Sequence, residues 1–142
     1  MKKLPLIYAC AGCSQAGCRA YLVAREIQRR GLARMSCLAG VAARRPNFMK
    51  ELENRALWVV DGCPIECARG AIESLASIER HLKLHELGIP KNGTSKLGTR
   101  ELVDRLLSEP VRTEPPVPPT LEPCNTPSLT APTGPSSTSW PS

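Results

Sequence analysis

Short apolar runs alternate with segments of helical periodicity along the first three quarters of the chain. Three runs are typical of β-strands, over residues 6–10, 33–38 and 56–63, and a helical pattern follows each of them. A strand followed by a helix, three times over, is typical of βαβ units and a parallel sheet. The pattern therefore predicts an α/β fold: a small three-layer, Rossmann-like and mostly parallel sheet of three to four strands with flanking helices.

Three helices are predicted from the apolar spacing and from start and stop signals. The first runs from about residue 15 to residue 30, and Gly31 is a suitable C-terminal stop. Pro46 and Pro64 open the second and third helices, because proline is favoured in the first turn. The positions expected to face the core are Ala20, Val23, Ala24 and Ile27, then Phe48, Leu52 and Ala56, then Ile65, Ala68, Ile72 and Leu75.

The segment that follows allows two interpretations. Residues 71–87 contain no glycine or proline, so the third helix could continue through them. Alternatively, Leu82 and Leu84 alternate with polar residues, which predicts a fourth strand ending near Gly88. Beyond it, Thr99 is expected to cap a last helix whose inward positions are Leu102, Val103, Leu106 and Leu107.

Composition separates a folded domain from a tail. Residues 110–142 hold 10 of the 14 prolines, with many serines and threonines and few large apolar residues. Such a segment cannot bury enough apolar surface to fold. We therefore expect one domain over residues 1–109 and a disordered tail over residues 110–142.

The seven cysteines indicate clustered thiols rather than a disulfide framework. An odd number of cysteines on a strand-helix alternation is typical of a reducing compartment, where thiols bind metal or carry out redox chemistry. The apolar stretch after Lys2 and Lys3 is shorter than a signal-peptide core and contains Pro5. No run approaches the length of a membrane span. The expected location is cytoplasmic, without a membrane partner.

Five cysteines are expected to meet at one edge of the sheet. Cys10, Cys37 and Cys63 each end a predicted strand, and Cys13 and Cys67 follow in the adjoining loops. In open parallel sheets, ligands bind outside the carboxyl ends of the strands. The spacing C-x2-C, then C, then C-x3-C therefore predicts a thiol site in that position.

Residues 61–68 contain most of the candidate chemistry. Gly62 allows a sharp exit from the third strand, and Pro64 suits the first helical position. Cys63 and Cys67 are then expected on one face of the helix start, where the helix dipole favours thiolate. Asp61 is expected to orient a ligand or to cap the loop rather than to catalyse.

These motifs resemble a known family. The stretches at residues 8–14 and 35–40, together with Asp61-Gly62-Cys63-Pro64 and Cys67-Ala68, are similar to the DGC domain family, named for its Asp-Gly-Cys motif. The resemblance extends over most of residues 6–109. It implies a zinc-binding domain of bacterial and archaeal type with four chelating cysteines, and a strand before Gly88. Carried over by motif, the four are Cys10, Cys37, Cys63 and Cys67; Cys13 is also common in the family, so the choice of four stays open.

Three chemistries suit such a cluster. Zinc accepts four thiolates, and a filled four-cysteine shell is structural or regulatory rather than hydrolytic. An iron–sulfur cluster also takes four cysteines. A thiol redox or persulfide-carrying enzyme would use Cys63 as the attacking thiol and Cys67 or Cys10 to resolve the intermediate. The resemblance favours zinc, and whether the protein is an enzyme is left open.

The other candidates are weaker. His81 and His85 share a face and are expected to be solvated, with His85 an alternative ligand in a histidine-containing site. Cys18, on the first helix, is a weaker candidate, and Cys124 in the tail is expected to be incidental. Few aromatic residues are available to stack on bases and no helix-turn-helix is visible, so the net charge of +6 does not indicate a nucleic-acid partner. The basic surface is expected to comprise Arg19, Arg25, Arg29, Arg30, Arg34, Arg44 and Arg45.

Overall fold

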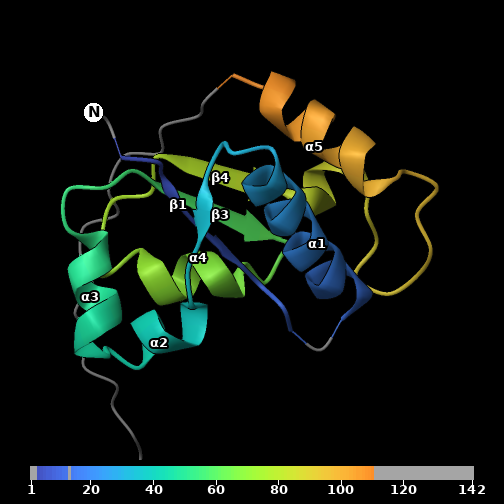
Figure 1. Ribbon diagram of the computed structural model, residues 1–142. Helices are drawn as coiled ribbons and strands as arrows, with labels where there is room; N and C mark the ends of the chain where they lie inside the picture. The colour runs from blue at the N-terminus through green and yellow to red at the C-terminus, as the bar shows by residue number, and fades with distance from the viewer. Residues whose placement is uncertain (1–2, 13, 111–142) are drawn as a thin grey trace, which may run out of the picture.

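The computed structural model describes residues 3–12 and 14–110, which form a four-stranded parallel sheet with helices on both faces (Figure 1). The strands are β1 (Leu6–Ala9), β2 (Arg34–Met35), β3 (Leu57–Asp61) and β4 (Arg80–Lys83), in the spatial order β2-β1-β3-β4. All three strand pairs are parallel. The α/β fold and the parallel sheet predicted from the apolar runs are therefore confirmed.

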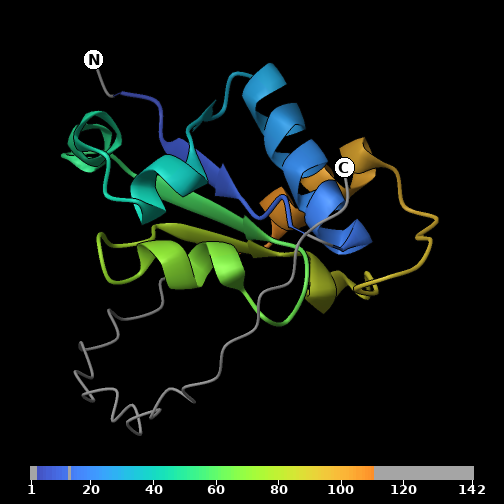
Figure 2. The same cartoon turned by 90° about the horizontal axis from the view of Figure 1, so that it is seen from below.

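The helices divide between the two faces of the sheet. One face is covered by α1 (Gln15–Arg29) and α5 (Thr99–Ser108). The other is covered by α2 (Leu38–Ala42), α3 (Pro46–Leu52) and α4 (Cys67–Ile72), so that α1 and α4 lie on opposite sides of the sheet (Figure 2). The chain after β1 and the chain after β3 thus leave in opposite directions, which places a topological switch between these neighbouring strands. Open α/β sheets bind ligands at such a point.

The alternation of side chains along β1 supplies both cores. Ile7 and Ala9 pack into the layer formed by α1 and α5, whereas Leu6 and Tyr8 pack into the layer formed by α2, α3 and α4. All four residues are buried, as expected for a strand covered on both faces. The sequence of β1 is therefore continuously apolar and does not alternate between apolar and polar residues.

Helix α1 confirms the first helical prediction to within one residue. Its N-cap is Ser14, whose hydroxyl accepts a hydrogen bond from the Gly17 N–H at 3.1 Å. Gly31 follows the helix with φ of +71°, a conformation that glycine adopts without strain. The residues predicted to face the core are all buried: Ala20, Val23, Ala24 and Ile27.

Residues 71–87 form a helix end followed by a strand. Helix α4 ends at Ile72, and the Glu79 N–H then donates to the Leu57 carbonyl as the chain enters β4. A short 3-10 helix, η1 (Leu84–Leu87), follows, and Gly88 ends it with φ of +75°. The strand interpretation is confirmed, because Leu82 has an apolar layer to enter. The continuous helix is excluded.

Several predicted boundaries are wrong. Helix α3 begins at Pro46 as predicted but ends at Leu52, because Asn54 takes a left-handed conformation and Ala56 already pairs with β1 through its carbonyl. Strand β2 has two residues instead of six, and the five-residue α2 that follows it was not predicted. The N-cap of α5 is Gly98 rather than Thr99.

The expected basic surface is largely engaged in contacts within the protein. Arg19 donates to the carbonyls of Leu97 and Ser95, at 2.8 and 3.0 Å, and so fixes the loop before α5. Hydrogen bonds from Arg29 and then Arg30 lower the pKa of Glu26 to about 2. These arginines are therefore held by contacts within the protein.

Across the described residues, every helix is too short or too polar to span a lipid bilayer. Beyond residue 110, the predicted tail lies outside the described residues.

Gly62 is a position where a side chain does not fit. A Cβ atom there would collide with the backbone of Ala16 and Gly17 at the start of α1. We expect the Gly62→Ala variant to lose about 1–3 kcal/mol of unfolding free energy, because the colliding atoms are backbone and cannot rotate away. Chemical denaturation measures this loss.

The matched control is Gly70→Ala in α4. A Cβ atom at Gly70 meets nothing within 4 Å, so alanine should leave stability unchanged or raise it by about 0.5–1 kcal/mol. Equal denaturation midpoints for the two variants would show that the close approach at Gly62 is not a packing constraint.

Candidate thiol site

The sheet order brings three cysteine-bearing strand ends side by side. Because β1 lies between β2 and β3, residues Cys10, Cys37 and Cys63 follow three adjacent strands at the same edge. The ladder continues past the strand ends, since the Cys10 N–H donates to the Val60 carbonyl at 3.0 Å and the Ser36 N–H to the Ile7 carbonyl at 3.2 Å. This topology agrees with the prediction that the three segments lie at one edge of the sheet.

Cys10 lies at the centre of this edge and is half-buried. Burial raises the pKa of its thiol above the usual value, and a hydrogen bond from the Gly12 backbone partly opposes that rise. The Asp61 carboxylate raises this pKa further, as do Cys67 and Cys63 in their thiolate form. Three thiols and one carboxylate therefore share one electrostatic neighbourhood around Cys10.

Cys37 is the N-cap of α2. Its sulfur accepts a hydrogen bond from the Gly40 N–H at 3.3 Å, and the residue is exposed. A cysteine in this position uses its sulfur where serine or aspartate would use oxygen. The thiol is thereby directed at the first turn of α2, next to the edge that carries Cys10.

Cys63 and Cys67 do not lie on one face of a helix start, which corrects the prediction. Cys63 is 7% exposed and packs into the α1 layer, whereas Cys67 is the exposed first residue of α4. The cause is Glu66, which takes a left-handed conformation (φ 52°, ψ 46°) and donates its N–H to the Cys63 carbonyl at 3.1 Å. This turn delays the helix by three residues and leaves Ile65 63% exposed instead of in the core.

The donor chemistry of this edge suits a thiophilic metal, but the described arrangement is not a closed ligand shell. The five described cysteines, Cys18 included, are all free thiols. Within residues 3–12 and 14–110, no three cysteine, histidine, aspartate or glutamate side chains are close enough to share a metal ion. Cys13, the remaining predicted ligand, lies outside the described residues. The residue types fit zinc, and the described side chains would have to converge to hold it.

Asp61 is buried and holds the first turn of α4. Its Oδ1 accepts from the Ala68 N–H at 2.9 Å, and its Oδ2 accepts from the Arg69 N–H at 3.0 Å. These are two of the backbone donors that a helix N-terminus leaves unpaired. The carboxylate therefore caps α4, and not the Gly62-Cys63 loop as expected.

The two histidines are not solvated, which corrects a second expectation. His81 is 6% exposed at its side chain and places Nε2 2.9 Å from Asp61 Oδ2, and the Nε2 of His85 lies 3.6 Å from Glu66. Sequence reasoning missed this role, although the alternation with Leu82 and Leu84 placed both histidines on one face. That face is covered because α4 packs on it.

Comparisons with known proteins point to one family. The model of the DGC domain matches residues 6–109. A protein of Pseudomonas aeruginosa PAO1 described as "Anaerobic and virulence modulator AnvM" is 38% identical over 90 residues, which cover 62% of this chain and 69% of that protein. No solved structure matches the chain.

Proposed function

This chain belongs to the DGC domain family, and on that premise we propose that it is a metal-binding protein that takes zinc through cysteine thiolates. The observation that carries the proposal is the sheet order: three adjacent parallel strands deliver Cys10, Cys37 and Cys63 to one edge. Cys67 begins the helix after the third of these strands. Ligand-binding sites of open parallel sheets occupy this position.

The electrostatics of the edge support a cation there. Cys10 lies near Asp61, Cys67 and Cys63, and the Asp61 carboxylate raises the pKa of Cys10, as either neighbouring cysteine does in its thiolate form. A divalent cation would reverse that balance and favour the thiolate form of each ligand. The residues that would hold zinc are Cys10, Cys37, Cys63 and Cys67, with Cys13 able to replace one of them.

A four-thiolate shell leaves no open coordination position, so the proposed role is structural, sensing or metal-handling rather than hydrolytic. The relative's name describes a modulator, which favours sensing. Thiolates that bind metal reversibly require a reducing compartment, and we place the protein in the cytoplasm on that ground.

Thiol redox chemistry is the second candidate, favoured by the free, exposed thiol of Cys67 close to the half-buried Cys10. Cys67 is exposed and could attack a disulfide, after which Cys10 or Cys63 could resolve the mixed disulfide. The substrate would gain two electrons and the protein would be left with one disulfide. A filled metal site protects its thiols, whereas a redox pair stays reactive.

We expect protein purified under anaerobic conditions to be colourless and to contain about one equivalent of zinc. Elemental analysis and the visible absorption spectrum measure this directly. Iron, acid-labile sulfide and broad visible absorption would establish an iron–sulfur cluster instead. Metal-free protein that forms a disulfide reversibly would establish the redox candidate.

A further inference from the structure

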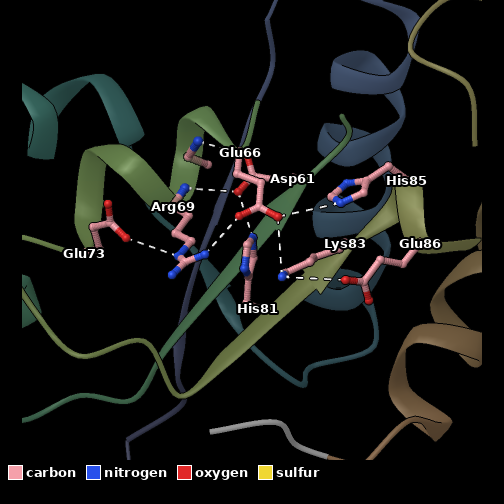
Figure 3. Close-up of polar contacts among 9 residues, drawn as sticks. Asp61, Glu66, Arg69, Glu73, His81, Lys83, His85 and Glu86 are labelled. Carbon is pink, nitrogen blue, oxygen red and sulfur yellow. Dashed lines mark hydrogen bonds and ion pairs between the residues drawn. The ribbon is translucent and has the colours of Figure 1, made fainter. Parts of the chain in front are cut away.

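Strand β4 presents a row of basic side chains to the turn that carries Cys63 and Cys67. His81 and Lys83 lie on the face of β4 opposite Leu82, as expected for a strand with period two, and His85 follows them in η1. Figure 3 shows all three directed at the two carboxylates that flank this turn, those of Asp61 and Glu66.

The contact between His81 and Asp61 is the most buried of these. The side chains are 6% and 1% exposed, and His81 Nε2 lies 2.9 Å from Asp61 Oδ2. An ionised carboxylate only accepts hydrogen bonds, so the ring nitrogen donates. Asp61 therefore receives three donors: the N–H groups of Ala68 and Arg69, and His81.

Glu66 forms a second contact with the same strand. Although burial raises its pKa, the hydrogen bond from Arg69 and the charges of His81 and Lys83 lower it below the usual value. Its carboxylate lies 3.1 Å from Arg69, 3.4 Å from Lys83 and 3.6 Å from His85. These contacts compensate the left-handed backbone of Glu66, which disfavours a residue with a side chain.

We propose that His81 is a positioning residue of the thiol site. By donating to Asp61, it fixes the carboxylate that holds the first turn of α4, and so sets the place of Cys67 relative to the sheet edge. The inference rests on the proposed function, because the segment that His81 positions carries the proposed metal ligand Cys67. A hydrogen bond that orients a ligand-bearing segment is the kind of support that metal sites depend on.

Two amides provide a matched pair of variants at this position. Glutamine places its amide nitrogen near the position of the histidine Nε2, whereas asparagine places it near that of Nδ1, out of reach of Asp61. Both are polar and uncharged, so they differ chiefly in whether the donor reaches the carboxylate. His81→Leu serves as a second non-donating variant, and Leu82→Ala weakens β4 from its opposite, apolar face.

The first readout is amide hydrogen exchange in metal-free, full-length protein. In His81→Asn and His81→Leu we expect the Ala68 and Arg69 amides to exchange about 10-fold faster or more, relative to the Val60 amide of β3. The rate at which Cys67 is alkylated, divided by the rate for Cys18 on α1 in the same molecule, should differ from the wild-type ratio in the same variants. His81→Gln should restore both to within about 3-fold of wild type, and Leu82→Ala should show no selective effect.

The second readout is zinc affinity by chelator competition. We expect a loss of about 10-fold or more in His81→Asn, with recovery in His81→Gln. Amide exchange that became faster by the same factor throughout the protein would show that His81 only stabilises the fold. A zinc affinity in His81→Asn equal to that in Leu82→Ala would show the same. If the wild-type protein takes no zinc, the proposed function fails, while exchange and alkylation still decide whether His81 positions Cys67.

Discussion

Replacing Asp61 by alanine is expected to lower the free energy of unfolding by about 3–5 kcal/mol. The buried carboxylate accepts hydrogen bonds from Ala68 N–H at 2.9 Å, Arg69 N–H at 3.0 Å and His81 Nε2 at 2.9 Å. Alanine leaves these donors without their acceptor in a place that water does not readily reach. The loss is a large fraction of the stability of a domain of this size.

Asp61→Asn provides the matched comparison, because it keeps the shape and one acceptor but turns the other oxygen into a donor. In the position of Oδ1 that amide meets the Ala68 N–H, and in the position of Oδ2 it meets both the Arg69 N–H and His81 Nε2. With one oxygen still able to accept, we expect a smaller loss, of about 1–3 kcal/mol. Urea denaturation followed by circular dichroism measures both variants. A loss in Asp61→Ala below about 1 kcal/mol would contradict the role of this carboxylate in holding α4.

The parts of the fold that follow from local patterns could be predicted from the sequence. The alternation of strands and helices through Cys10, Cys37 and Cys63 predicted a parallel sheet. The continuous apolar runs of β1 and β3 agree with it, because such strands are covered on both faces. The shared edge for the three cysteines then followed from the direction of the strands. Helix α1 was predicted well because its periodicity and the stop signal at Gly31 agree with one another.

The relation between Cys63 and Cys67 could not be predicted in this way. It depends on the left-handed backbone of Glu66, and nothing in a glutamate at that position signals such a conformation. Pro64 suggested an earlier helix start, which propensity favours locally but the contacts of Glu66 with Arg69, Lys83 and His85 override. The environment of His81 was missed for a related reason, because its burial depends on where α4 packs.

The largest change in metal content is expected for the Cys63→Ser/Cys67→Ser variant, which should contain almost no zinc. The two residues come from opposite sides of the Glu66 turn, so a metal that joined them to Cys10 would tie β1, β3 and α4 together. Part of the binding free energy would then appear as folding free energy. We expect the melting temperature to fall by about 5–10 °C, less than in a zinc finger, because two apolar layers already supply a core.

The single variants separate metal loss from damage to the core. Cys63 is 7% exposed, so Cys63→Ser buries a hydroxyl and costs stability even if the thiol is not a ligand. Cys67 is exposed, so Cys67→Ser should lower the melting temperature only by losing metal, and a chelator should bring the wild-type protein to the same value. Cys124→Ser in the tail should change neither metal content nor melting temperature. Full zinc content and an unchanged melting temperature in Cys67→Ser would remove Cys67 from the ligand set, and its thiol should then be tested for reversible disulfide formation with Cys10 or Cys63.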